Sequence, residues 1–255
     1  MEVELKNLDT IAKPDWCPGC GNFAIQVAVK QALTNLQIEP HTVAIVSDIG
    51  CSGKLPHWVN SYGLHSIHGR APAVAMGFKL VQSKYVVWIV VGDGDGFSIG
   101  LSHILHMFRR NIDVNILFIN NKVYGLTKGQ MTPTSGKGYI SPSSPFGAIE
   151  EPLNPIALAL SLGGTFIARG SSGNAPQLAK IIEAAIQHKG FALIDIFQPC
   201  VTFNKINTYA YFLQHTYNID EEEGYNRKNW EEAMKRARQT DKYPIGIIYQ
   251  SDHKT

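Results

Sequence analysis

Five short apolar runs, separated by helical patterns, constrain the fold of this chain more than any other feature. The runs are rich in β-branched residues, are bounded by Gly, Asn, Asp or Pro, and lie at Thr42–Ser47, Val86–Val91, Val114–Ile119, Thr165–Ala168 and Phe191–Phe197. Helical spacing of apolar residues follows Asn22 and recurs at Ile99–Arg109, Pro155–Leu162 and Ala175–His188. Because the strands are apolar throughout, the alternation predicts an α/β fold, with a mostly parallel sheet covered by helices on both faces.

Length and composition narrow the class of protein. A chain of 255 residues is long enough for one large α/β domain, which we expect at residues 1–200. With 44% hydrophobic residues and a net charge of +2, the chain lacks the basic field of a nucleic-acid-binding protein. The apolar run Val86–Val91 is far shorter than the roughly 20 residues that cross a bilayer, so we expect no membrane span. The first ten residues lack a secretory signal, which predicts a cytoplasmic location.

Polar or cysteine-containing segments follow four of the five predicted strands. They are Asp48-Ile49-Gly50-Cys51, Gly92-Asp93-Gly94-Asp95, Asn120-Asn121 and Pro199-Cys200. In open α/β sheets, ligands bind outside the carboxyl ends of the strands. We therefore expect these four sequence-distant segments to meet at one edge of the sheet and to form a site there.

The segments at Asp93 and Asn121 have the chemistry of a magnesium-diphosphate site. The glycines around Asp93 let backbone N–H groups approach phosphate oxygens, and a helix predicted to begin near Ser98 would point its positive end at them. Carboxylate and amide oxygens are ligands that Mg²⁺ prefers. A structural alternative is that the Asp93 segment is only a turn and Asn120-Asn121 only the end of a strand. A calcium-binding EF-hand loop is excluded, because its twelfth position, counted from Asp93, is Ile104 instead of Glu. Asn121 lies 28 positions after Asp93, and with this spacing the pair resembles the thiamine diphosphate motif.

The four cysteines suggest a second metal centre. Cys17 and Cys20 form a Cys-x-x-Cys pair in a Pro-Gly turn, and Cys51 and Cys200 follow predicted strands. Four thiolates suit either zinc or an iron–sulphur cluster. A redox disulfide between Cys17 and Cys20 is a weaker alternative, because it leaves the other two cysteines unexplained.

Two further segments do not follow the alternation of predicted strands and helices. Residues 122–152 are rich in Gly, Pro, Ser and Thr, and so long a loop inside a domain is usually functional or disordered. We predict an active-site loop there. Residues 201–255 form a C-terminal arm with a helical pattern near Trp230–Arg238 and an apolar run at Ile245–Tyr249, which we expect to pack on the domain or on a partner subunit.

Several motifs in order resemble the β subunit of 2-oxoacid:ferredoxin oxidoreductases. They are Cys-Pro-Gly-Cys-Gly at 17–21, Gly-Cys-Ser-Gly-Lys at 50–54, His-Gly-Arg-Ala at 68–71, the Asp93 turn, and Asn-Asn-Lys-Val-Tyr-Gly at 120–125. The resemblance covers roughly residues 14–204. It implies the diphosphate-binding domain of the thiamine diphosphate enzymes as the fold.

The resemblance also implies a set of site residues. Cys17, Cys20, Cys51 and Cys200 would bind one [4Fe-4S] cluster, and Asp93, Asn121 and the backbone carbonyl of Val123 would bind Mg²⁺. His68, Lys54 and Lys128 are the candidate catalytic residues; as single residues, a structural histidine and solvated lysines are common alternatives. The candidate cofactor contacts are Gly50, Cys51, Ser52, His68, Gly92, Asp93, Gly94, Asp95, Asn121, Val123, Gly125 and Leu126.

The activity implied is the oxidative decarboxylation of a 2-oxoacid with coenzyme A, with 2-oxoglutarate slightly favoured over pyruvate. Complete single-chain thiamine enzymes are much longer than this chain. We therefore expect an α subunit to supply the aminopyrimidine-binding domain in a heterodimer, and ferredoxin to take the electrons. Two alternatives stay open: a non-redox thiamine diphosphate decarboxylase subunit with a structural zinc, and a non-catalytic iron–sulphur electron-transfer subunit.

Overall fold

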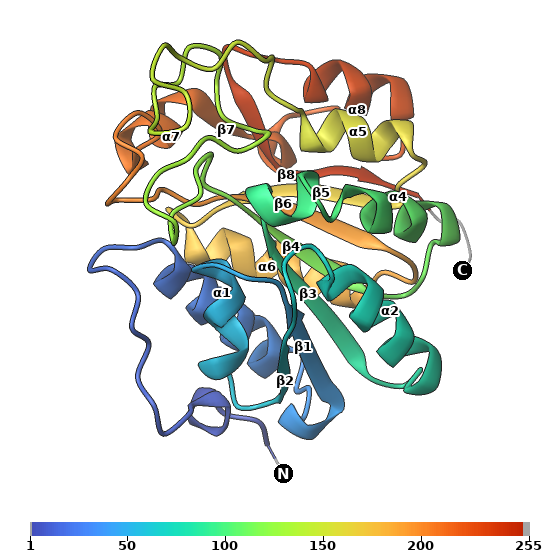
Figure 1. Cartoon of the computed structure of the whole chain (residues 1–255). Coiled ribbons are helices and arrows are strands. Elements are labelled where there is room, and N and C mark those ends of the chain that lie inside the picture. Colours follow the sequence, from blue (N-terminus) through green and yellow to red (C-terminus); the bar gives the residue numbers. More distant parts are fainter. Residues whose placement is uncertain (1, 252–255) are drawn as a thin grey trace.

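The fold is built on one eight-stranded sheet, in a computed structural model that describes residues 2–251 (Figure 1). Along the sheet the order is β2-β1-β3-β4-β6-β5-β8-β7, and every neighbouring pair is parallel except β5 and β8. The strands are β1 Val43–Ser47, β2 Tyr62–His65, β3 Val86–Gly92, β4 Asn115–Asn120, β5 Phe166–Ser171, β6 Ala192–Phe197, β7 Thr216–Asn218 and β8 Tyr243–Gln250. The predicted mostly parallel sheet is confirmed.

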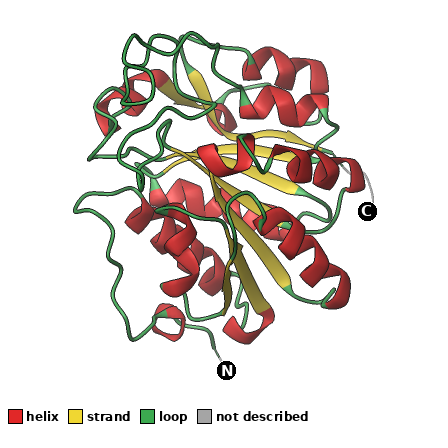
Figure 2. Cartoon of the chain, viewed as in Figure 1, coloured by secondary structure: helices red, strands yellow, loops and turns green. Residues whose placement is uncertain are grey.

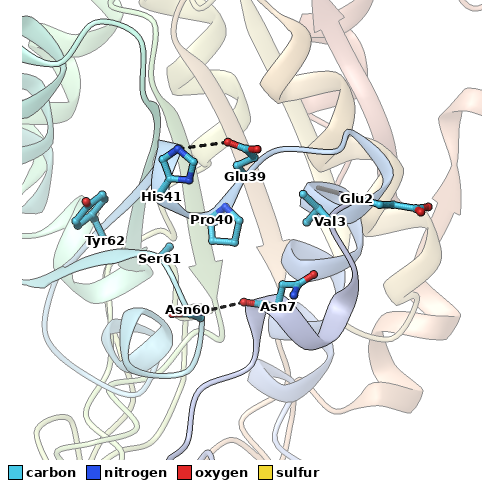
Figure 3. A pocket seen from close by; sticks show the side chains of 9 residues that line it. All are labelled: Glu2, Val3, Asn7, Glu39, Pro40, His41, Asn60, Ser61 and Tyr62. Carbon is cyan, nitrogen blue, oxygen red and sulfur yellow. Dashed lines mark hydrogen bonds and ion pairs between the residues drawn. The ribbon is translucent and has the colours of Figure 1, made fainter.

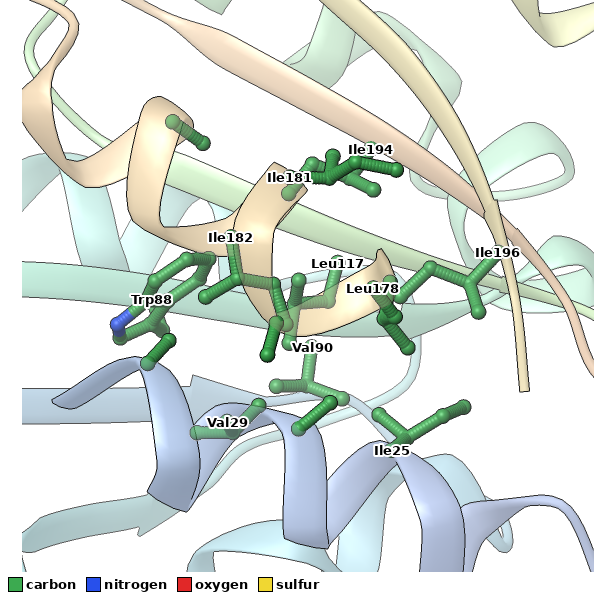
Figure 4. Close-up of a cluster of buried hydrophobic side chains, with 14 of the residues drawn as sticks. Ile25, Val29, Trp88, Val90, Leu117, Leu178, Ile181, Ile182, Ile194 and Ile196 are labelled. Carbon is green, nitrogen blue, oxygen red and sulfur yellow. The ribbon is translucent and has the colours of Figure 1, made fainter. Parts of the chain in front are cut away.

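Helices cover both faces of the sheet (Figure 2). They are α1 Asn22–Asn35, α2 Ala71–Val81, α3 Asp93–Phe97, α4 Leu101–Arg110, α5 Pro155–Ser161, α6 Ala175–Gln187, α7 Tyr209–His215 and α8 Trp230–Ala237. On one face, α1 and α6 pack against the central strands, as Figure 4 shows for Val29 and Ile182 near Trp88 and Val90. On the other face lie α2, α4, α5 and α8. This double cover explains why β4 and β6 are buried at every position.

Most predicted elements occur within two or three residues of their expected bounds, and the differences have local causes. The helix expected near Ser98 begins at Leu101 as α4, and a separate five-residue helix, α3, begins at Asp93. Sequence periodicity missed α2, although Pro72 in its first turn is a helix-start signal. It also missed β2, an edge strand that is exposed at all four positions and so shows no alternation.

The C-terminal residues complete the sheet. β8 pairs antiparallel with β5, and β7 pairs with β8, so much of the segment after residue 200 packs on the sheet itself. The helix predicted around Trp230 is present as α8. No helix within residues 2–251 combines the length and apolarity that crossing a bilayer requires.

The order of the central strands positions the site. β1, β3, β4 and β6 are consecutive parallel neighbours. The four segments singled out in the sequence follow these four strands, so they lie at one edge as expected.

Candidate functional site

A cavity of about 460 Å³ opens at the carboxyl edge of β1, β3 and β4. All twelve residues predicted as cofactor contacts, from Gly50 to Leu126, line it. Four residues outside the predicted cofactor contacts complete the lining: Ile49, Tyr124, Thr127 and Gln130. The fold therefore brings the predicted residues together around one ligand-sized space.

Asp93 is the most deeply buried carboxylate of this cavity. It is 1% exposed, and one carboxylate oxygen lies 2.6 Å from the hydroxyl oxygens of both Thr132 and Thr134. Burial raises the pKa of Asp93 to about 6, although the hydrogen bonds from Thr132 and Thr134 favour its charged form. The long loop thus contributes two polar contacts to Asp93, and only its tertiary path reveals which loop residues do so.

Asn121 lines the same cavity as Asp93 and follows the neighbouring strand, β4. Its amide oxygen accepts a hydrogen bond from the backbone N–H of Val123 at 3.0 Å. Tyr124 closes the adjoining wall and donates its hydroxyl to the backbone oxygen of Gly94 at 2.9 Å. A Cβ at Gly94 would lie 2.1 Å from the Tyr124 ring, so glycine is required for this close approach.

His68 and Asp95 form a pair at the cavity wall. Nδ1 of His68 lies 2.8 Å from Oδ1 of Asp95, which fixes the ring and leaves Nε2 as the free nitrogen. The pKa of Asp95 is raised to about 7, first by burial and then by the nearby carboxylates of Asp48 and Asp93. This arrangement suits a histidine that holds or moves a proton at the cavity.

Asp48 has a structural role in this arrangement. Its Oδ1 accepts hydrogen bonds from the backbone N–H groups of Arg70 and Ala71, at 2.9 and 2.8 Å, where α2 begins. Burial raises the pKa of Asp48 to about 6. The carboxylate therefore fixes the start of α2, just after the turn that carries His68.

The four cysteines line a second, smaller cavity of about 40 Å³. All four are free thiols, and burial raises the pKa of Cys20 to about 11. Gly125 faces two of them: a Cβ there would lie 3.5 Å from the sulphur of Cys200 and 3.8 Å from that of Cys51. Within residues 2–251, no three His, Cys, Asp or Glu side chains are arranged to hold a single metal ion.

The two cavities share a wall. Cys51, Asn121 and Gly125 line both the large cavity and the cysteine-lined one. The protein thus separates the two spaces by the thickness of a few side chains, although their residues come from four distant parts of the chain.

The two candidate lysines lie outside the lining of the large cavity. Lys54 pairs with Asp15, with 2.9 Å between Nζ and Oδ2, in a partly exposed position. Lys128 is exposed on the loop and adopts a positive φ of 74°. A substrate contact by either lysine remains a prediction.

A larger cavity, of about 530 Å³, lies at the opposite edge (Figure 3). Its residues precede β1 and β2 or belong to the N-terminal segment, and they include Glu39 and His41, whose Oε2 and Nε2 atoms lie 3.3 Å apart. Since it lies at the amino ends of the strands and contains none of the strand-end motifs, we do not assign the chemistry to it.

Comparisons with known proteins agree with this geometry. A family model described as "Thiamine pyrophosphate enzyme, C-terminal TPP binding domain" matches residues 48–196. A second family model, for the C-terminal part of the pyruvate ferredoxin oxidoreductase beta chain, matches residues 200–255. The 2-oxoacid:ferredoxin oxidoreductase subunit beta of Saccharolobus solfataricus is 44% identical, over 93% of this chain and 82% of that protein.

Two further relatives are informative. The 2-oxoglutarate oxidoreductase subunit KorB of Mycobacterium tuberculosis is 46% identical, over 74% of this chain and 51% of that protein. The solved structure of the 2-oxoglutarate:ferredoxin oxidoreductase from Magnetococcus marinus, with 2-oxoglutarate, coenzyme A and succinyl-CoA bound, superposes with a TM-score of 0.97 at 38% identity. That match covers 99% of this chain and 87% of the solved chain.

Proposed function

The chain belongs to the β subunits of the 2-oxoacid:ferredoxin oxidoreductases, and we propose that it binds the diphosphate end of thiamine diphosphate beside an electron-accepting [4Fe-4S] cluster. The complete enzyme would convert a 2-oxoacid and coenzyme A into acyl-CoA and CO₂ and pass the electrons to ferredoxin. The observation that carries the proposal is the wall formed by Cys51, Asn121 and Gly125 between the two cavities.

The diphosphate site fits a magnesium ion. Asp93 is a buried carboxylate whose pKa is raised by burial, which favours either protonation or a bound cation. Asn121 offers an amide oxygen on the same cavity, and Val123 offers its backbone carbonyl. Such oxygen ligands, completed by diphosphate and water, are the set that Mg²⁺ prefers. These three residues would hold the ion that fixes the diphosphate.

The cysteine-lined cavity fits an iron–sulphur cluster by its donor set. Four thiols that take part in no disulfide surround one space, and Gly125 leaves room where a side chain would contact two of the sulphurs. Cysteine thiolates are the usual ligands of [4Fe-4S] clusters. Because one cluster would use Cys17, Cys20, Cys51 and Cys200, no cysteine is left for a second, and an external carrier must take the electrons.

Thiamine diphosphate, when bound, would supply the electron sink for decarboxylation. The protein's own residues position the reactants. His68 would hold or move a proton at Nε2 while Asp95 fixes its Nδ1, and Tyr124 would close the wall against water. Lys54 and Lys128 are proposed carboxylate or phosphate contacts, which for Lys54 requires exchange of its Asp15 partner.

The proposed partner completes the thiamine diphosphate site, and the relatives indicate the substrate. This chain supplies only the diphosphate end, so an α subunit would supply the aminopyrimidine end at a shared interface. The KorB relative and the solved 2-oxoglutarate enzyme support 2-oxoglutarate over pyruvate as the 2-oxoacid.

Metal analysis of the anaerobically purified protein tests the proposal. We expect iron and sulphide in the proportions of a [4Fe-4S] cluster, with broad visible absorption. A single zinc in place of iron would favour the non-redox decarboxylase instead.

A second experiment tests the diphosphate site. Asp93→Ala should abolish retention of thiamine diphosphate and Mg²⁺ while the iron content stays unchanged. Asp241→Ala, which removes an exposed carboxylate outside both cavities, is the matched control. With the α subunit and coenzyme A, wild-type protein should reduce a low-potential dye most rapidly with 2-oxoglutarate. Unchanged cofactor affinity in Asp93→Ala would contradict the assignment.

A further inference from the structure

Gln198 lines the cysteine cavity and is hydrogen-bonded to Asn121, which lines both cavities. It follows the carboxyl end of β6, is 1% exposed, and lines the cysteine cavity together with Cys20 and Asn121. Buried side-chain amides are costly unless both their donor and acceptor sides are satisfied. The partners of Gln198 therefore indicate what its amide does.

The backbone fixes which way the amide points. The side-chain nitrogen of Gln198 donates to the backbone oxygen of Pro199 at 2.9 Å, and a carbonyl can only accept. The amide oxygen therefore faces the other way, where it accepts a hydrogen bond from Nδ2 of Asn121 at 3.2 Å. This contact in turn fixes the Asn121 amide, whose oxygen is left for the Val123 N–H and for a metal.

The second hydrogen on the Gln198 nitrogen reaches the cysteine cavity. Nε2 lies 3.4 Å from the sulphur of Cys20, within hydrogen-bonding distance of a sulphur acceptor. One amide group thus contacts a proposed magnesium ligand with its oxygen and a proposed cluster ligand with its nitrogen.

The packing around Gln198 holds this geometry. A Cβ at Gly21 would lie 2.9 Å from Cγ of Gln198 and 2.4 Å from the hydroxyl oxygen of Ser172. The backbone N–H of Gln198 also donates to the carbonyl of Asn120 at 3.1 Å. With the backbone fixed and the side chain confined, the amide has little freedom to rotate away from either partner.

We propose that Gln198 is a positioning residue that couples the two cofactor sites, by orienting Asn121 toward the metal and by donating a hydrogen bond to the sulphur of Cys20. The inference rests on the proposed function. Residues that orient metal ligands affect metal affinity by about 10- to 100-fold. A hydrogen bond to a cluster sulphur stabilises the more negative reduced state, so it raises the reduction potential.

The test uses the anaerobically purified complex with its α subunit and the variant Gln198→Met, which keeps the volume and removes both hydrogen bonds. We expect the affinity for Mg²⁺, titrated at fixed thiamine diphosphate by calorimetry, to fall by about 10- to 100-fold. We also expect the cluster potential, from a redox titration followed by electron paramagnetic resonance, to become more negative. Gln198→Leu, which also lacks the amide, should show both changes and serves if the methionine variant fails to fold.

The control is Gln26→Met. Gln26 is also buried and donates one hydrogen bond to the backbone of Trp58, but it lines neither cofactor cavity. Affinity and potential should both match the wild type. A purely structural role for Gln198 would lower stability without moving the potential.

The outcomes separate this inference from the proposed function. A wild-type complex without an iron–sulphur cluster would overturn the proposed function and the coupling with it. A wild type with both cofactors, together with Gln198 variants that change neither property or only one, would overturn the coupling alone.

Discussion

The buried ion pair between Arg169 and Asp195 gives the sharpest prediction about stability. The two residues face each other across β5 and β6, with 2.8 Å between Nε and Oδ2, and are 3% and 0% exposed. The other oxygen of Asp195 accepts a hydrogen bond from Asn120 at 2.9 Å. The oxygen of Asn120 lies 3.1 Å from the hydroxyl oxygen of Thr134, which contacts Asp93. The ion pair is therefore connected, through Asn120 and Thr134, to Asp93 in the large cavity.

Replacing Arg169 by Met leaves the buried Asp195 carboxylate without its hydrogen-bonded cation, although the charge of Lys122 also interacts with it. Breaking a buried pair from one side costs about 3–5 kcal/mol in free energy of unfolding. Nη1 of Arg169 has no hydrogen-bond partner within residues 2–251, so the pair is imperfectly satisfied. We therefore expect the lower end, about 3 kcal/mol.

Urea unfolding followed by circular dichroism measures this loss as a lower midpoint with an unchanged dependence on urea. The double variant Arg169→Met with Asp195→Asn should recover part of the stability, because an amide replaces the unpaired charge and can still accept from Asn120. A loss below about 1 kcal/mol, the usual value of an exposed pair, would refute the reasoning. So would a double variant as unstable as the single one.

Three further substitutions test individual contacts of the site. The pKa of Asp48 is about 6 in the folded protein, above its ordinary value of 3.8. Protonated Asp48 therefore stabilises the folded state fully below pH 4, and this stabilisation is lost as the pH rises through 6. Asp48→Asn should therefore reduce the fall in unfolding free energy between pH 4.5 and pH 8, by up to about 2 kcal/mol, and equal falls in both proteins would contradict this. Gly125→Ala should leave the stability of the cluster-free protein unchanged, because its Cβ makes ordinary contacts 3.5 Å from the sulphur of Cys200, yet lower the bound iron measured after reconstitution. Gly94→Ala should cost about 1–3 kcal/mol in urea unfolding, because its Cβ overlaps the Tyr124 ring, and a loss near zero would show that the ring moves aside freely.

The site was predictable to the extent that it lies at strand ends. Asp93, Asn121 and Cys51 follow apolar strands directly, so strand order and the carboxyl-edge rule place them together without knowledge of any side-chain contact. Thr132 and Thr134 were not predictable in the same way. They lie within a long loop whose composition indicates function, but its path over Asp93 depends on packing far from the loop in sequence.

The contacts of Lys54 and Gln198 were also not predictable, because they involve segments that are distant in the sequence. The Gly-Cys-Ser-Gly-Lys motif predicts that Lys54 lies near the site, whereas the fold pairs it with Asp15, which is 39 residues away. Nothing in the sequence around Gln198 distinguishes it from a strand-end polar residue. Its two partners come from segments 77 and 178 residues away.

The sequence by itself determined the alternation of strands and helices, the edge of the sheet at which the candidate site residues gather, and the types of side chain that the proposed sites contain. These follow from local periodicity and from the chemistry of single side chains. Only the tertiary structure decided that Cys51, Asn121 and Gly125 form a wall common to two cavities, and that Gln198 contacts both sites. Such relations depend on how β1, β4 and β6 and their loops pack in three dimensions, and contacts between distant segments leave no periodic trace in a single sequence.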